Sequence, residues 1–184
     1  MPHSDIARDV ALRIKLVLLD VDGVLTDNGV YVGESEDGSY IELKRFHILD
    51  GLGIKMLRAA GMEVALVSGR NSPASARRAK ELGIACRQAD AGFKMEAVKE
   101  LMQLHGVDWN EIAWMGDDLP DLPAMRRVGL PVAVANAVSE IQAVALWTTS
   151  NHGGHGAVRE FTEALLKARG QWTQLVDEYV AKRQ

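Results

Sequence analysis

Residues 16–27 read LVLLDVDGVLTD, a short apolar run followed by two aspartates, Asp20 and Asp22, and then Gly23. An apolar run that stops at Asp-Gly predicts a strand at 16–21 that is buried on both faces. Similar runs at 63–67, 111–115, 131–135 and 146–148 alternate with helical patterns at 49–60, 72–82, 94–105, 119–127, 139–144 and 156–169. This alternation predicts an α/β fold in which helices cover both faces of a parallel sheet.

Residues 30–46 interrupt the alternation after the first strand. Two segments with alternating polarity flank Asp37-Gly38, a pattern that predicts an antiparallel β-hairpin. Because a projecting hairpin exposes strand edges and apolar side chains, it is a candidate contact between subunits. We expect one domain over residues 1–184, with the hairpin inserted at about 28–46 and a tail at about 150–184.

The composition narrows the class of protein. The 184 residues include 21 Lys and Arg against 25 Asp and Glu, and 47% are hydrophobic, which is typical of a globular protein. A net charge of −4 argues against a broadly basic nucleic-acid binder, and one cysteine, Cys86, excludes an internal disulfide framework. With no apolar run long enough for a membrane span and no apolar signal-peptide core at 1–15, we expect a cytoplasmic protein with no membrane or nucleic-acid partner.

The aspartates at the end of the first strand indicate metal chemistry. Asp20 and Asp22 leave the strand on the same side, and ligands of open α/β sheets bind beyond the carboxyl ends of the strands. Close carboxylates repel each other unless a cation such as Mg²⁺ compensates them. The alternative is an Asp-Gly turn with solvated carboxylates. An EF-hand loop is excluded, since Val24 and Leu25 stand where it needs an oxygen ligand and a glycine.

Three further polar segments follow later strands, and each has an ordinary alternative. Ser68-Gly69-Arg70 is suited to holding a phosphate, or is a helix cap. Lys94 could neutralise an anion, or is a solvated surface lysine. Residues 116–121, which read GDDLPD, place more carboxylates at the same edge, or form an acidic helix start.

Taken in order, these motifs resemble the haloacid dehalogenase (HAD) superfamily of phosphotransferases over about residues 14–166. The matching segments are 20–26, 67–70, Lys94 and 116–121. A narrower resemblance, carried by residues 46–55, the hairpin and residues 153–160, is to a capless, tetrameric HAD subfamily, the 3-deoxy-D-manno-octulosonate 8-phosphate (KDO-8-phosphate) phosphatases. The resemblance implies a Rossmann-like three-layer αβα core without a cap domain. Close relatives of that subfamily act on nine-carbon sialic-acid-type sugar phosphates.

The resemblance also implies roles for particular residues. Asp20 is expected to be the nucleophile that forms an aspartyl-phosphate, and Asp22 the general acid and base. Ser68 and Lys94 are expected to hold phosphoryl oxygens, and Mg²⁺ to bind Asp20, the backbone carbonyl of Asp22, and Asp117. The implied activity is Mg²⁺-dependent hydrolysis of a sugar-acid phosphate, KDO-8-phosphate, in lipopolysaccharide precursor synthesis, by a homotetramer.

A further set of residues is expected around the substrate. Arg70, Arg159 and His47 could grip the carboxylate of a sugar acid, although a structural role for His47 is an equal alternative. Within this set, Thr26 and the Gly23 backbone are expected to shape the turn, and Asp118 or Asp121 to orient metal-bound water or Lys94. The full expected set is Gly23, Thr26, His47, Asp50, Gly69, Arg70, Asp118, Asp121 and Arg159.

Two positions depart from the subfamily. Ala89-Asp90 replaces its usual Gln-Gly, and His155 stands where it often has arginine; both changes bear on the sugar and leave the phosphoryl machinery intact. A different class of function, a phospho-acceptor signalling domain, also combines strand-end carboxylates with lysine and Mg²⁺. Asp22 argues against it, because such domains lack a paired acid and base to hydrolyse the acyl phosphate.

Overall fold

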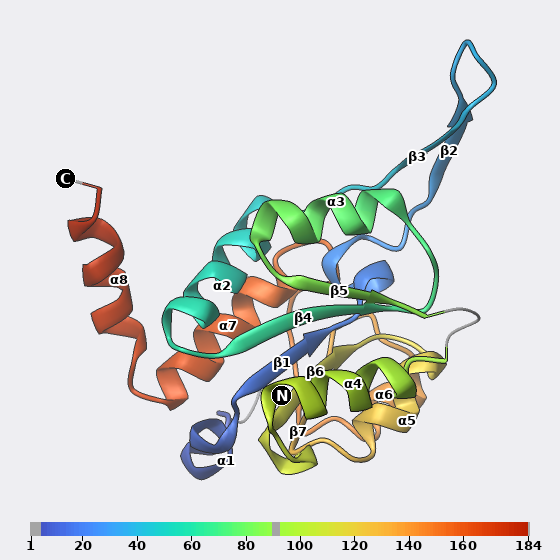
Figure 1. The fold of residues 1–184 in the computed structure, drawn as a ribbon. Coiled ribbons are helices and arrows are strands. Elements are labelled where there is room, and N and C mark those ends of the chain that lie inside the picture. The colour runs from blue at the N-terminus through green and yellow to red at the C-terminus, as the bar shows by residue number, and fades with distance from the viewer. Residues whose placement is uncertain (1–4, 90–92, 184) are drawn as a thin grey trace.

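The computed structural model describes residues 5–89 and 93–183, and a six-stranded parallel sheet forms its centre (Figure 1). The strand order is β5-β4-β1-β6-β7-β8, and Leu19 of the central strand β1 pairs with Leu66 of β4 and Met115 of β6. The strands span Leu16–Leu19 (β1), Glu63–Ser68 (β4), Ala85–Gln88 (β5), Ile112–Gly116 (β6), Leu130–Ala133 (β7) and Trp147–Thr148 (β8). The predicted parallel α/β fold is confirmed.

Helices cover both faces of this sheet (Figure 1). One face carries α2 (Ile48–Ala59), α3 (Pro73–Leu82) and α7 (Ala157–Ala168); the other carries α4 (Met95–His105), α5 (Leu122–Met125) and α6 (Ser139–Gln142). The terminal helices are α1 (Arg8–Arg13) and α8 (Trp172–Ala181), and α8 stands away from the sheet. None of the helices in residues 5–89 and 93–183 has the length and apolar character that crossing a bilayer requires.

Helix α3 illustrates how local sequence sets the element boundaries. The Ser72 hydroxyl accepts a hydrogen bond from the backbone N–H of Ser75 at 3.2 Å, and Pro73 occupies the first helical position. Gly83 ends the helix in the left-handed conformation, with φ of +68°. These signals agree with the predicted limits of 72–82.

Two predicted elements need correction. The helix predicted at 119–127 is a 3₁₀ turn, Leu119–Asp121, followed by the four-residue α5, because Pro120 and Pro123 cannot donate within a longer helix. Strand β5 was not predicted, since Arg87 and Gln88 break its apolar pattern. It is a half-buried strand at the sheet edge, where a continuous apolar run is not required.

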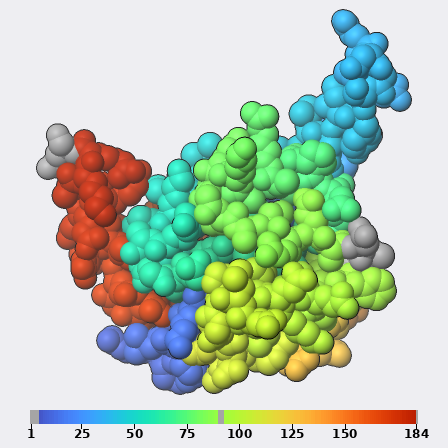
Figure 2. All heavy atoms as spheres, in the orientation of Figure 1, coloured from blue at the N-terminus to red at the C-terminus, as the bar shows by residue number. Residues whose placement is uncertain are grey.

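The predicted hairpin is present as β2 (Tyr31–Glu34) and β3 (Tyr40–Leu43), paired antiparallel with Tyr31 opposite Leu43. Figure 2 shows that it stands clear of the body of the molecule. Its large exposed apolar side chains are Val30, Tyr31, Val32, Tyr40, Ile41 and Leu43. A two-stranded ribbon with these side chains has little apolar surface of its own to pack against.

Candidate active site

The segments predicted to carry chemistry meet in one pocket of about 290 Å³ beyond the carboxyl ends of β1, β4 and β6. This is the edge at which open parallel sheets bind ligands. The pocket is lined by Asp20, Asp22, Asn28, Gly69, Arg70, Lys94, Asp117, Asp118, Pro120 and Asp121.

Three carboxylates form a buried cluster in this pocket. One oxygen each from Asp20, Asp117 and Asp121 lies within 4.8 Å of the others. The Lys94 ammonium donates to Asp20 Oδ1 at 2.6 Å and to Asp121 Oδ1 at 2.7 Å. Lys94 is therefore not a solvated lysine: it is 4% exposed and holds two of the three acids.

The electrostatics of the cluster favour a bound cation. Burial and the neighbouring Asp121 raise the pKa of Asp117 to about 7, and the same two causes raise the pKa of Asp20 well above its usual value. Burial alone would lower the pKa of the Lys94 ammonium, but the negative charges of Asp20 and Asp121 have the larger effect and raise this pKa. One ammonium among three buried carboxylates leaves negative charge uncompensated. Mg²⁺, which binds oxygen ligands, fits this donor set.

The loop after β1 brings Gly23 against the cluster. Gly23 has φ of +87°, and a Cβ built on it would lie 1.9 Å from Asp117 Oδ2. The buried Thr26 hydroxyl donates to the Val21 carbonyl at 3.3 Å and accepts from the Gly23 N–H at 3.4 Å. These contacts agree with the expectation that Thr26 and the Gly23 backbone shape the turn, and a contact of Thr26 with substrate stays a prediction.

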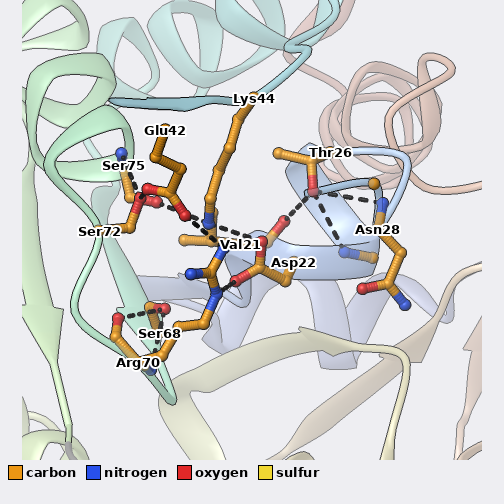
Figure 3. Close-up of polar contacts among 12 residues, drawn as sticks. Val21, Asp22, Thr26, Asn28, Glu42, Lys44, Ser68, Arg70, Ser72 and Ser75 are labelled. Carbon is orange, nitrogen blue, oxygen red and sulfur yellow. Dashed lines mark hydrogen bonds and ion pairs between the residues drawn. The ribbon is translucent and has the colours of Figure 1, made fainter. Parts of the chain in front are cut away.

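The side chain of Asp22 points toward Lys44 and Arg70 (Figure 3). Its Oδ1 accepts from Lys44 Nζ at 2.6 Å, and its Oδ2 accepts from Arg70 Nε at 2.9 Å. Two cationic side chains therefore hold the Asp22 carboxylate, and the binding of Mg²⁺ by its backbone carbonyl stays a prediction.

Sequence reasoning missed three residues at this site. Lys44 and Glu42 reach it from the end of the hairpin, where Glu42 forms an ion pair with Arg70 at 2.6 Å. Asn28 adopts φ of +67° and places its amide 3.5 Å from Asp117 Oδ2. Side chains alternate between the two faces of an extended strand, so Glu42 and Lys44 point to the same side. This spacing was the sequence signal that could have identified the two residues.

Ser68 and Gly69 lie where the sequence predicted, at the end of β4. The Ser68 hydroxyl is fully buried, donates to the Arg70 carbonyl at 3.0 Å and accepts from the Arg70 N–H at 3.3 Å. The hydroxyl thus fixes the turn that carries Arg70 into the pocket. Its contact with a phosphoryl oxygen stays a prediction.

The two remaining acids of the 116–121 segment differ in environment. Asp121 is fully buried, and its Oδ2 accepts from the Asp117 N–H at 3.0 Å while its other oxygen holds Lys94. The contact with Lys94 agrees with the expectation that Asp121 could orient that lysine. Both oxygens of Asp121 are occupied by the protein, which argues against a direct contact with substrate. Asp118 is exposed and accepts from the Leu119 N–H at 2.8 Å.

Three expected substrate-binding residues, Asp50, His47 and Arg159, lie neither in the lining of this pocket nor in the loop after β1. Asp50 is fully buried and accepts from the Arg159 N–H at 2.8 Å, so it caps the start of α7. The positive end of that helix stabilises a carboxylate there, which corrects the expectation for Asp50. His47 and Arg159 line a separate open groove of about 900 Å³ together with Leu49 and Lys167. Within one chain they do not face Asp20.

Residues 153–155 pack against the loop that carries the aspartates. The Gly154 N–H donates to the Val24 carbonyl at 2.9 Å, and a Cβ on Gly153 would lie 1.7 Å from the Gly23 oxygen. His155 lies 3.5 Å from Arg45 Nη1. The other departure from the subfamily is Ala89-Asp90, and Asp90 lies outside the residues that the structure describes.

Comparison with known proteins identifies the family. Residues 89–161 match the model of the haloacid dehalogenase-like hydrolases. The chain is 42% identical over 159 residues to the 3-deoxy-D-manno-octulosonate 8-phosphate phosphatase KdsC of Haemophilus influenzae, covering 86% of each chain. This chain belongs to the haloacid dehalogenase-like hydrolases. It is also 38% identical over 170 residues to the enzyme of the same name from Salmonella typhi, covering 92% of this chain and 88% of that one.

Solved structures of this hydrolase family agree with the fold. A Moraxella catarrhalis 3-deoxy-D-manno-octulosonate 8-phosphate phosphatase, in complex with a magnesium ion, a phosphate ion and KDO, matches with a TM-score of 0.82 at 37% identity. The match covers 96% of this chain and 97% of that one. A cobalt-bound phosphatase from Haemophilus influenzae matches with a TM-score of 0.81 at 41% identity, covering 89% and 94% of the two chains.

Proposed function

We propose that this hydrolase is a Mg²⁺-dependent phosphatase that cleaves KDO-8-phosphate to KDO and phosphate. The observation that carries the proposal is the pocket in which Lys94 donates to the buried Asp20 and Asp121. Asp117 completes the acidic cluster, and Asp22 lines the same pocket as a separately held carboxylate. The names of the similar phosphatases support the substrate, and the magnesium and phosphate in one of them support the chemistry.

The residues of this chain divide the reaction into two steps. An Asp20 oxygen attacks phosphorus, the bond from phosphorus to the sugar oxygen breaks, and protonated Asp22 gives its proton to that oxygen. Asp22 then takes a proton from water, whose oxygen attacks phosphorus, and the bond to Asp20 breaks. Lys94 holds the nucleophile and counters phosphoryl charge. Asp20, Asp117 and the Asp22 carbonyl would hold Mg²⁺, which would further stabilise that charge.

Arg70 is suited to recognising the sugar-acid end of the substrate. Its side chain lines the pocket and is 38% exposed, whereas its partner Glu42 is almost buried. A guanidinium can bind a carboxylate through two parallel hydrogen bonds. We place the activity in lipopolysaccharide precursor synthesis in the cytoplasm, which is the setting that this substrate implies.

We also propose that the chain acts as a homotetramer assembled through the hairpin. The support is the set of exposed apolar side chains on β2 and β3, which a subunit contact would bury. Val32→Glu, at a side chain that is 65% exposed, is expected to reduce the molar mass measured by light scattering, while Lys80→Glu on the exposed part of α3 should leave it unchanged. A wild-type monomer with full activity would refute the assembly.

Phosphate release from a panel of substrates tests the activity. KDO-8-phosphate is expected to be the best substrate, with turnover abolished by EDTA and by Asp20→Asn. Preference for a nine-carbon sialic-acid-type phosphate would keep the mechanism and change the sugar. Stable retention of the phosphoryl group with little turnover would instead support a phospho-acceptor domain, and phosphate release undiminished in Asp20→Asn would remove the mechanism.

A further inference from the structure

Lys44 follows the last residue of β3, at the base of the hairpin, and belongs to none of the motifs that predicted the site. Its ammonium nevertheless contacts Asp22 (Figure 3). The distance from Lys44 Nζ to Asp22 Oδ1 is 2.6 Å, and the lysine side chain is fully buried. Lys44 Nζ also lies 3.2 Å from the Ser75 hydroxyl on α3. A buried lysine bound on two sides loses its usual freedom of movement, so its position fixes that of its partner.

The second partner of Asp22 is held differently. Arg70 contacts Asp22 Oδ2, but its side chain is 38% exposed and it shares its charge with Glu42. Solvent and a bound substrate can therefore compete for the guanidinium, whereas they cannot reach Lys44. The two oxygens of Asp22 thus have one permanent and one exchangeable partner.

We propose that Lys44 is a positioning residue for Asp22: it holds Oδ1 so that Oδ2 is the oxygen that exchanges protons with the sugar oxygen and with water. An ammonium has three donor hydrogens and no acceptor, so Lys44 occupies Oδ1 as an acceptor. Oδ2, whose partner Arg70 is 38% exposed, is the oxygen whose partner can be exchanged. This inference rests on the proposed function and adds to it a residue that the hairpin supplies to the catalytic step.

The two-step reaction gives Lys44 a distinctive kinetic signature. With p-nitrophenyl phosphate the leaving group departs as a stable anion, so the first step needs little help from Asp22, but hydrolysis of the aspartyl-phosphate still needs a base. With a sugar phosphate both steps depend on Asp22. With p-nitrophenyl phosphate, a misplaced Asp22 therefore slows the second step more than the first. A general loss of structure would slow both steps alike.

The test compares Lys44→Met, Lys44→Arg and the exposed control Lys80→Met as full-length enzymes with Mg²⁺. For Lys44→Met we expect kcat on the sugar phosphate to fall about 10- to 100-fold with little change in KM. With p-nitrophenyl phosphate we expect a rapid burst of one product per active site and accumulation of phosphoenzyme. Lys44→Arg should restore part of kcat and reduce the burst, and Lys80→Met should match the wild type.

Several results would overturn this role for Lys44. They are an unchanged kcat in Lys44→Met, an equal slowing of both steps without a burst, or no recovery in Lys44→Arg. If thermal melting shows that Lys44→Met does not fold, Ser75→Ala replaces it, because it removes the other polar contact of Lys44; a loss of kcat with a burst supports the proposal, and no change contradicts it. Failure of wild-type enzyme to hydrolyse any phosphomonoester would refute the proposed function instead.

Discussion

Gly23 and Asp117 are in such close contact that no side chain fits between them. A Cβ on Gly23 would lie 1.9 Å from Asp117 Oδ2 and 2.5 Å from its Cγ. The loop after β1 and the loop after β6 are thereby fixed against each other, which holds the nucleophile and the expected metal ligand at one point. The acidic cluster therefore depends on backbone packing as well as on the identity of its carboxylates.

Gly23→Ala is expected to displace Asp117 and to lower kcat/KM by about 100-fold, since displacements near 1 Å can have effects of that size. It should also destabilise the fold by about 1–2 kcal/mol, because φ of +87° is unfavourable for alanine. Gly61→Ala is the matched control: Gly61 has φ of +83°, but a Cβ added there would meet nothing within 4 Å. Its stability should fall similarly while its activity stays near wild type. Equal activity losses in both variants would contradict the role given to the contact.

The raised pKa of Asp117 predicts a pH dependence of Mg²⁺ binding. Burial and Asp121 raise this pKa from 3.8 to about 7 in the metal-free protein, so below about pH 7 the cation must displace a proton. The affinity for Mg²⁺ should rise up to tenfold per pH unit as the pH approaches 7 and then level off. Titration calorimetry in buffers of different ionisation enthalpy measures both the affinity and the protons released. An affinity that is flat across this range, with no proton release, would be inconsistent with the cluster.

The same group affects the stability of the metal-free protein. Between pH 3.8 and about 7 the folded state holds a proton on Asp117 that the unfolded state has lost. The contribution of Asp117 to the free energy of unfolding therefore decreases as the pH rises through this window. Added Mg²⁺ should raise the melting temperature more at the upper end of the window than at the lower end.

Asp121→Asn should weaken the coupling within the cluster. Because Asp121 raises the pKa of both Asp20 and Asp117, its removal should move the midpoint of the Mg²⁺-binding pH profile to lower pH. Lys94 also loses one of its two carboxylates, so we expect a reduced kcat and a smaller melting-temperature gain on adding Mg²⁺. The neighbouring exposed Asp118 provides the comparison. Its charge also raises the pKa of Asp117, but less than that of Asp121 does, so Asp118→Asn should move the midpoint less. An unshifted midpoint in Asp121→Asn would show that Asp121 does not act on the metal ligands.

The parts of the fold and site that were predictable from sequence depend on local patterns. The run at 16–19 and the aspartates that follow it lie within one short segment, so periodicity and strand-end geometry place them correctly. Lys94 could be assigned to the site from sequence because other charged segments were expected at the same edge of the sheet. The structure confirms that it reaches Asp20 across a sequence separation of 74 residues.

The missed and corrected residues depend on long-range packing that no local pattern records. Lys44 acts on Asp22 only because the hairpin folds back to the loop after β1. Asp50 is committed to the start of α7, 109 residues away, so its carboxylate could not be separated from a ligand-binding one by sequence alone. His47 depends on the same packing, since it lies beside that helix start in the other groove.

The central claim is that Asp20 is transiently phosphorylated. The most direct test is to quench the reaction with KDO-8-phosphate and Mg²⁺ in acid and to locate the phosphoryl group by peptide mass spectrometry. We predict an adduct on Asp20 that is absent without Mg²⁺ and in Asp20→Asn. In Asp22→Asn we predict that the adduct accumulates with p-nitrophenyl phosphate, whose leaving group needs little help from Asp22. An Asp20→Asn variant that still turns over, or a phosphoryl group found on a different residue, would contradict the account.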